Sequence, residues 1–256
     1  MRAINLFSGS TGNCKFIDTG KKRFLIDAGG SAKAICQALE DIGSDIALIN
    51  GIFITHEHSD HTHALEVLLK KYPVPVHIMK STYNALKVKE GTVLYTCAVL
   101  HDGEYVEDVG DGCKIEAFFV PHDSVCCVGY KITTDDDSVG IVTDIGYVTQ
   151  RVYDCLCGCK SVMIEANHDI DMVKQGCYPD SLKRRILSGG GHLSNRDCAQ
   201  ISGALARQGT KNILLMHMSL ENNKPELALN EVCGSVNAYG VSVSVASADT
   251  PTVLKR

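Results

Sequence analysis

The chain has 256 residues, 45% of them hydrophobic, and a formal net charge of -5. This length and composition allow one compact domain with a full core. The negative charge argues against a protein that holds nucleic acid through a broad positive face, because such binding depends on many Lys and Arg contacts to phosphate. The densest basic run, residues 183–185, is followed by Arg196; a local nucleic-acid contact and a solvated helix face both explain it.

The first residues, MRAINLFSGS, lack the apolar core of a signal peptide, and no segment is long enough to span a membrane. We therefore expect a cytoplasmic protein with no membrane partner. The twelve cysteines are expected to be reduced thiols, since the chain is long enough to build its own core. Cys155, Cys157 and Cys159 lack the paired CxxC spacing of zinc ribbons, so no cysteine is assigned to a metal site.

Apolar, β-branched segments indicate about eleven strands. They cover residues 2–7, 15–20, 23–29, 51–55, 74–79, 114–120, 126–133, 138–144, 161–166, 212–217 and 241–246. Helical periodicity predicts helices over residues 31–43, 59–72, 194–209 and 224–240. No repeat and no Pro- or Ser-rich linker divides the chain, so we expect a single α/β domain over residues 1–256.

The segment FITHEHSDHTHAL gathers metal-seeking side chains where a predicted strand gives way to a helix with Ser59 as its expected N-cap. Alternate residues of an extended segment point the same way, so His56 and His58 can face one point. Asp60 and His61, in the first helical turn, can face a second point nearby. Imidazole and carboxylate groups are typical ligands of Zn and Mn, and the pattern predicts two adjacent divalent metal ions.

A metal pair needs further ligands, and we expect them at other strand ends. Asp144 and His217 each end a predicted strand segment, and His122 follows one by two residues, at the end of AFFVPH. With Asp27 in FLIDAG and the HEHSDH motif, they follow the order of the five motifs of the metallo-β-lactamase-fold hydrolases, which this chain resembles over essentially its whole length.

The resemblance implies a fold and a set of roles. The expected fold is α/β, a four-layer αββα metallo-β-lactamase sandwich. One metal is expected on His56, His58 and His122, the other on Asp60, His61 and His217, with Asp144 bridging the two ions. Asp27 is expected beside the ligands, bracing the HEHSDH loop by hydrogen bonds; without the family context, a turn residue at a strand end is the alternative explanation.

Two further motifs indicate a branch of this superfamily. Glu165 ends the segment MIE, and His192 lies in the Gly-rich turn GGGHLSN. These motifs are similar to those of ribonuclease Z and its nuclease relatives, in which a Glu and a His pair beside the metals. The resemblance implies that Glu165 orients His192, which protonates the departing sugar oxygen or steadies the phosphorane. Taken alone, His192 is explained as a surface turn residue. Asp60, Glu165 and His192 form the expected catalytic group.

The spacing of the motifs excludes larger branches. His122 and Asp144 are 144 - 122 = 22 residues apart, and His192 and His217 are 217 - 192 = 25 apart. These intervals leave no room for the long arm of ribonuclease Z or for a β-CASP insertion. The segments INLFSGSTGNCKFIDTG, IEANHD and GHLSN resemble the YycJ/WalJ (VicX) family of bacterial exonucleases. That resemblance implies a metal-dependent DNA exonuclease that works from 5′ ends and serves mismatch repair. The segment HDSVCCVGY departs from the small and proline residues usual there.

A phosphodiesterase mechanism follows from the charges. Water held between two divalent ions loses its proton near neutral pH, which gives a bridging hydroxide as nucleophile. Two carboxylates and one hydroxide against two divalent ions leave the site with a net charge near +1 by simple counting, so an anionic phosphate is attracted locally. The loop SGSTGN offers Ser10 and Asn13 as contacts to a substrate phosphate; a plain hairpin turn explains the same composition.

Two other functions remain open at this point. A glyoxalase II-like or lactonase-like hydrolase of a small thioester or ester accounts for the metal ligands but gives Glu165 and His192 no task. A scaffold protein that keeps metals for stability is disfavoured. Structural zinc sites are usually closed, whereas the expected ligand set leaves an open position for a hydroxide.

Overall fold

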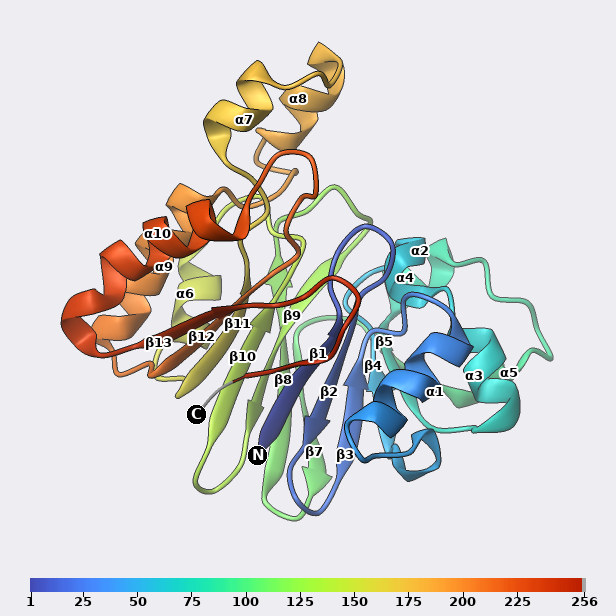
Figure 1. Ribbon diagram of the computed structural model, residues 1–256. Coiled ribbons are helices and arrows are strands. Elements are labelled where there is room, and N and C mark those ends of the chain that lie inside the picture. The colour runs from blue at the N-terminus through green and yellow to red at the C-terminus, as the bar shows by residue number, and fades with distance from the viewer. Residues whose placement is uncertain (255–256) are drawn as a thin grey trace. The chain divides into compact units, whose positions relative to one another are not determined.

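A computed structural model gives the fold and describes residues 1–254. The chain divides into two compact units. The first unit contains residues 1–106, 124–127 and 247–253, and the second contains residues 107–123 and 128–246 with Leu254. Within the described residues, each unit is built on one mixed sheet of seven strands with helices beside it (Figure 1).

The sheet of the first unit has the order β14-β1-β2-β3-β4-β5-β6. Its strands are β1 (Arg2–Phe7), β2 (Cys14–Asp18), β3 (Arg23–Ile26), β4 (Gly51–Phe53), β5 (Val76–Met79), β6 (Ala98–His101) and β14 (Thr252–Val253). The strands from β14 to β3 are antiparallel, and those from β3 to β6 are parallel. Apolar side chains such as Leu6, Phe16 and Leu25 are fully buried, as expected for strands packed against helices.

The helices of the first unit are α1 (Ala32–Asp41), η1 (Ile46–Leu48), α2 (Ser59–Thr62), α3 (Leu65–Lys71), α4 (Lys80–Ala85) and α5 (Val93–Cys97). Helix α1 is capped by Ser31, whose side chain accepts a hydrogen bond from the Ala34 N–H. The helix predicted over residues 59–72 is interrupted between α2 and α3. The prediction of Ser59 as N-cap is wrong: Ser59 is the first helical residue, because the His61 N–H donates to the carbonyl of His58.

The sheet of the second unit has the order β13-β12-β11-β10-β9-β8-β7. Its strands are β7 (Tyr105–Gly110), β8 (Cys113–Val120), β9 (Cys127–Thr133), β10 (Ser138–Val142), β11 (Ser161–Glu165), β12 (Asn212–Met216) and β13 (Ser242–Val245). The four strands from β10 to β13 are parallel. Their carboxyl ends therefore lie at one edge of the sheet, where ligand-bearing side chains of α/β proteins commonly gather.

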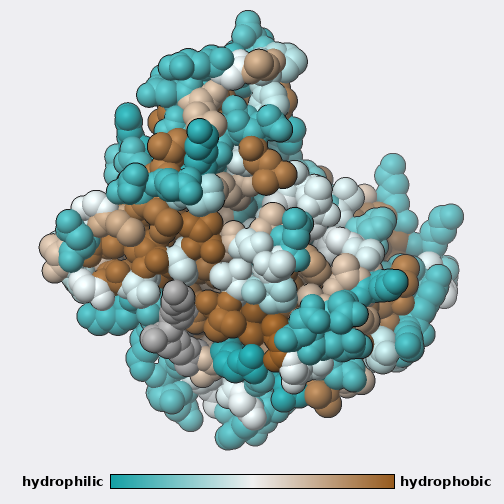
Figure 2. All heavy atoms as spheres, in the orientation of Figure 1, coloured by the Kyte–Doolittle hydropathy of each residue, from teal (hydrophilic) through white to brown (hydrophobic). Residues whose placement is uncertain are grey.

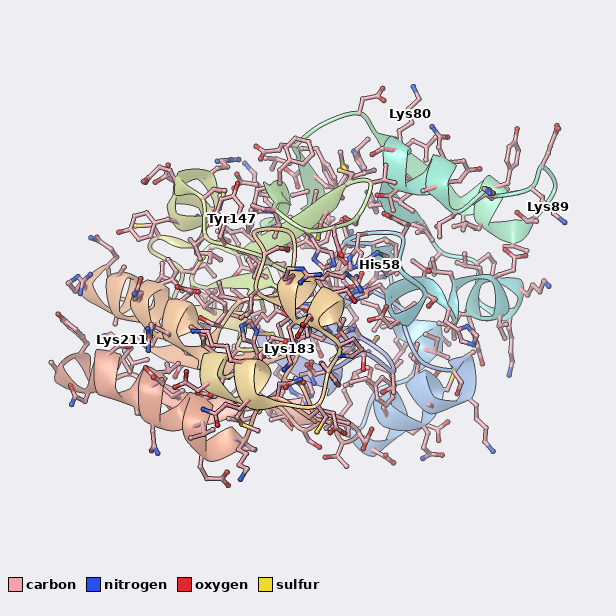
Figure 3. The ribbon with its side chains drawn as sticks, turned by 90° about the horizontal axis from the view of Figure 1, so that it is seen from above. His58, Lys80, Lys89, Tyr147, Lys183 and Lys211 are labelled. Carbon is pink, nitrogen blue, oxygen red and sulfur yellow. The ribbon has the colours of Figure 1, made fainter. Side chains whose placement is uncertain are left out.

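The helices of the second unit are α6 (Gln150–Leu156), α7 (Ile170–Gln175), α8 (Asp180–Ile186), α9 (Asn195–Arg207), α10 (Pro225–Val236) and η2 (Asn237–Tyr239). Helices α9 and α10 pack against each other beside β11–β13, whereas α7 and α8 stand beyond the strand ends (Figure 1). Helix α8 carries the basic run of residues 183–185 and has no buried residue, and the surface over α7 and α8 is mostly hydrophilic (Figure 2).

All eleven predicted strands are present, as β1 to β5 and β8 to β13. The four predicted helices appear as α1, α2 with α3, α9 and α10. Strands β6, β7 and β14 and helices α4 to α8 were not predicted. Over residues 1–254, no helix has both the length and the apolar character needed to cross a bilayer.

Candidate metal centre

Three candidate residues lie within two positions of the end of a strand. Asp27 follows β3, His217 follows β12, and Asp144 lies two residues beyond β10. All three have positive φ, of 64°, 52° and 55° respectively. This left-handed region is unusual for residues other than glycine, although Asp and His adopt it more readily than most. Each strand therefore ends in a sharp turn that sets the direction of a polar side chain.

In the first unit, the HEHSDH motif brings its histidines together as the alternation predicts. His56 Nε2 lies 3.0 Å from His58 Nδ1. Two nitrogen ligands of a tetrahedral zinc ion, each about 2.0 Å from the metal, are about 3.3 Å apart, so these two atoms are placed as ligands of one ion would be. Asp60 and His61 also meet, with Asp60 Oδ2 3.4 Å from His61 Nε2.

The fully buried carboxylate of Asp27 organises this loop. Its Oδ1 accepts hydrogen bonds from the Thr55 backbone N–H at 2.8 Å and from Thr55 Oγ1 at 2.9 Å. Its Oδ2 lies 2.8 Å from His61 Nδ1 and 3.8 Å from Nζ of Lys15, which is also fully buried. Burial works to raise the pKa of Asp27, but the neighbouring charges of His61 and Lys15 and these hydrogen bonds hold it below its usual value.

Backbone contacts fix Asp60. The Asn13 N–H donates to the Asp60 carbonyl at 2.7 Å, and the Gly29 N–H donates to the Asn13 carbonyl at 2.9 Å. A Cβ at Gly29 would lie 1.6 Å from the Asp60 carbonyl oxygen, so only glycine permits this approach.

The structure places the two expected substrate contacts differently. Asn13 is buried, and its Nδ2 lies 3.1 Å from Asp60 Oδ2 and 3.0 Å from His61 Nε2. Ser10 is exposed and lines a pocket with Asp60. Asn13 therefore touches the side chains of two predicted ligands, whereas Ser10 faces solvent beside one of them.

In the second unit, His122 and Asp144 lie near each other, with His122 Nε2 3.8 Å from Asp144 Oδ1. Nδ1 of His122 is 3.2 Å from the carbonyl of Gly191, one residue before His192. Burial lowers the pKa of His122, which favours the neutral form that binds metals.

Glu165, the last residue of β11, connects two histidines. Its Oε1 lies 2.8 Å from Nδ1 of His192 and 2.7 Å from Nδ1 of His217. Its Oε2 accepts from the Ile145 N–H at 2.8 Å. The structure thus brings together Glu165 and His192, as the motifs indicate, and it adds a contact to His217 that the sequence did not reveal.

The charges in this cluster shift the protonation of His192. Burial acts to lower its pKa, but the charge and hydrogen bond of Glu165, with further help from the Asp144 carboxylate, raise the pKa of His192 to about 9. Burial acts to raise the pKa of Glu165, but the neighbouring His192 and His217 outweigh this effect and hold that pKa well below its usual value. In the metal-free protein the two groups therefore favour a carboxylate on Glu165 and an imidazolium on His192.

The donor set fits divalent metal ions. In four predicted histidine ligands, Nδ1 lies beside an oxygen atom of the same unit. A hydrogen bond from Nδ1 to that oxygen leaves Nε2 as the nitrogen that can bind a metal. The four pairs are His56 with Thr55 Oγ1, His61 with Asp27, His122 with the Gly191 carbonyl and His217 with Glu165. Imidazole with carboxylate suits Zn and Mn, and Asp144, Glu165, His192 and His217 form a group compact enough to hold an ion.

Sequence reasoning missed three supporting residues. Thr55 was recognisable only by its place before the HEHSDH motif. Asn167, whose side chain donates to the His217 carbonyl at 2.8 Å, was visible as a polar residue after the strand that ends in Glu165. Lys15 gave no signal, because lysine is rarely buried.

Comparison with known proteins identifies the class. Residues 22–218 match the model of the beta-lactamase superfamily domain. The fold matches the crystal structure of the metallo-beta-lactamase fold protein YhfI from Bacillus subtilis, with a TM-score of 0.73, 14% identity and coverage of 98% of this chain and 99% of the other. It also matches Zn(2+)-bound PqqB from Methylobacterium extorquens, with a TM-score of 0.74, 15% identity and full coverage of both chains. The chain belongs to the metallo-β-lactamase superfamily, and the predicted fold class is confirmed.

Two relatives define the family more closely. Exodeoxyribonuclease YycJ of Bacillus anthracis is 37% identical over 94% of this chain and 91% of its own length. Exodeoxyribonuclease WalJ of Streptococcus pneumoniae serotype 2 is 38% identical over 97% and 95%. Within the superfamily, the chain is thus a member of the YycJ/WalJ family, as its motifs predicted.

Proposed function

We propose that this protein is a metal-dependent phosphodiesterase that degrades DNA as an exonuclease. The observation that carries the proposal is the position of Glu165 between His192 and His217. The thiolate released from a thioester leaves readily without a proton, whereas the sugar oxygen released from a phosphodiester is a strongly basic alkoxide that a positioned acid such as His192 can protonate. The names of the two exodeoxyribonuclease relatives support the same substrate.

In this proposal residues 1–256 act as one metallo-β-lactamase domain without a β-CASP insertion. Two divalent ions, Zn or Mn, are held by seven residues. They are His56, His58, Asp60, His61, His122, Asp144 and His217. When bound, the ions supply a deprotonated water at neutral pH and offset the charge of the scissile phosphate. The support for this ligand set is the order of the motifs, the family, and the fit of the donor atoms within each unit.

The protein's own groups complete the chemistry. Glu165 favours the protonated form of His192, because its carboxylate raises the pKa of that imidazole in the metal-free protein. His192 would release that proton to the leaving oxygen, and Glu165 would keep its ring in position. Asp60 would hold one ion from the side that faces solvent, since its side chain is 22% exposed. Asp27 would orient His61, and exposed Ser10 would contact a substrate phosphate. The expected contact of Asn13 with that phosphate would instead be indirect, because its buried amide holds the side chains of Asp60 and His61.

The polarity and setting of the reaction are further parts of this proposal. A 5′-to-3′ direction and a role in mismatch repair are supported by the resemblance to the YycJ/WalJ family. A cytoplasmic location is supported by the twelve cysteines, all of which are free thiols, because disulfides are rare in the reducing cytoplasm.

The test is cleavage of end-labelled DNA and matching RNA by the purified protein with added Mn or Zn. The control is the variant Asp60→Ala, His61→Ala. We expect progressive shortening of DNA from the 5′ end, absent with the control variant and after EDTA. If no nucleic acid is cleaved while both metals are bound, the exonuclease proposal is wrong, and hydrolysis of a small ester becomes the better explanation.

A further inference from the structure

The second unit contains a hollow of about 380 Å³ outside the metal ligands. It is formed by the loop after β10, the start of α6 and the start of α9. The lining side chains that matter here are Tyr147, Gln150, Tyr153, Asp197, Gln200 and Ile201.

The residues that line the hollow are close in sequence to Asp144 and to His192. Tyr147 is three residues after Asp144, and Asp197 is five residues after His192. Three residues of chain span at most about 11 Å, which is roughly the rise of three nucleotides along one DNA strand. A DNA strand with a phosphate at Asp144 can therefore place a nearby base in the hollow.

Tyr147 is held as an open aromatic surface. Its side chain is 53% exposed, and a Cβ at Gly189 would lie 3.3 Å from its Cδ1 and 3.5 Å from its Cε1. The ring thus rests against the backbone of the Gly-rich turn that leads to His192. Gly146 allows this turn to approach, because a Cβ there would lie 2.0 Å from the Gly189 carbonyl oxygen. A ring positioned in advance loses little entropy when a ligand stacks on it.

The chemistry of the lining favours a base over a phosphate. Among the described residues that form the hollow, none is Lys or Arg, and Asp197 is acidic. A phosphate would be repelled there, whereas a nucleobase is neutral. Every base has a face that can stack on tyrosine, and the amide of Gln200 and the hydroxyl of Tyr153 can pair with the donors and acceptors on a base edge.

We propose that this hollow binds one nucleobase of the DNA strand being degraded, stacked on Tyr147. The inference rests on the proposed exonuclease function and adds a base-binding subsite beside His192. It predicts that the enzyme holds its substrate partly through a base, so that affinity depends on whether a base is present at one position near the cleaved end.

The kinetic test compares Tyr147→Ala and Tyr147→Phe with the wild type. Loss of a stacked base costs roughly 5- to 100-fold in binding, so Tyr147→Ala is expected to raise KM on DNA about tenfold and leave kcat within about twofold. Tyr147→Phe keeps the ring and should keep KM. Tyr95→Ala, which removes a tyrosine that is 50% exposed on α5, is the matched control. Unchanged KM in Tyr147→Ala would overturn the inference while leaving the exonuclease function intact.

An abasic residue moved stepwise from the cleaved end identifies the stacked nucleotide. At one position, the abasic residue should raise the KM of the wild type as much as the substitution Tyr147→Ala raises KM on intact DNA. At that position, the abasic residue should not raise the KM of Tyr147→Ala any further. If the two losses simply multiply at every position, Tyr147 does not contact a base.

A binding assay separates failure of this inference from failure of the exonuclease proposal. The variant Asp60→Ala, His61→Ala is mixed with an oligonucleotide that carries the fluorescent base 2-aminopurine at the position identified with the abasic substrates. If the wild type cleaves no DNA, the probe is placed in turn at each position near the ends of the oligonucleotide. The chain has no Trp, so the probe signal is unobscured. Quenching that disappears after Tyr147→Ala supports base stacking even if no DNA is cleaved, and absence of quenching contradicts it.

Discussion

The substitution Asp27→Asn tests how the buried charges support the metal centre. Asp27 lies 3.8 Å from Lys15, and both side chains are fully buried. Lys15 Nζ has no hydrogen-bond partner among residues 1–254. Asn retains the size of the side chain and tolerates the φ of 64° at this position. The substitution therefore removes the charge with little effect on the backbone.

The distance sets the size of the effect. Two unit charges 3.8 Å apart attract each other by about 4 kcal/mol at an effective dielectric constant of about 20. Removing one partner of a buried pair typically costs about 3 to 5 kcal/mol, because the other charge is left uncompensated. We expect Asp27→Asn to lower the free energy of unfolding of the metal-free protein by this amount. Replacing both partners, as Asp27→Asn with Lys15→Met, should restore much of the loss.

Metal binding should also weaken. His61 Nδ1 lies 2.8 Å from Asp27 Oδ2, and an amide NH₂ there would favour the imidazole form that carries its proton on Nε2, the expected ligand atom. Loss of such a supporting carboxylate usually weakens metal affinity about 10- to 100-fold.

Urea unfolding of the metal-free single and double variants, together with zinc titration, measures both effects. If the double variant is no more stable than Asp27→Asn alone, the uncompensated charge of Lys15 is not the cause of the loss. If zinc affinity is unchanged, the proposed orientation of His61 is wrong.

Three further predictions concern other parts of the centre. In metal-free protein, Glu165 raises the pKa of His192 to about 9 against the effect of burial. The pair therefore stabilises the fold fully between about pH 4.5, the ordinary pKa of a glutamate, and about pH 6.5, and it loses its effect as the pH rises through 9. Urea unfolding at pH 6.5 and 9.5 should show this fall in the wild type and a smaller one in Glu165→Gln; an equal fall in both would contradict the assignment. Gly29→Ala should displace Asp60 and abolish binding of one metal equivalent, measured by metal analysis of the folded protein, and two retained equivalents would contradict it. His192→Ala should lower kcat on DNA about 10²- to 10⁴-fold with bound metal unchanged, and normal turnover would exclude its role as proton donor.

Much of the fold was predictable because its central strands are long apolar runs closed by polar residues. The elements that were missed have weaker signals. Strand β6 is only partly buried at a sheet edge, and β14 has two residues. Helices α4 to α8 have five to seven residues each, too short to show a helical period.

The residues of the candidate site were predictable to a different degree. His56 and His58 could be paired from spacing alone, because local backbone geometry sets their directions. The contact between Glu165 and His217 could not, since it joins residues 52 positions apart on neighbouring strands whose register the sequence does not reveal. Burial of Lys15 was equally hidden, because it depends on a charge partner that only the folded chain supplies.

The left-handed turns after β3, β10 and β12 limit which amino acids can occupy these positions. Outside glycine, Asn, Asp and His adopt this backbone most readily, and two of these also provide metal or hydrogen-bonding groups at Asp27, Asp144 and His217. A branched aliphatic residue would be penalised by the backbone as well as by the chemistry, and Glu would keep the carboxylate while changing its reach. Anyone transplanting this centre into another β-sheet protein would therefore have to copy the three turns along with the side chains, because ligands placed on ordinary extended strand ends would point elsewhere.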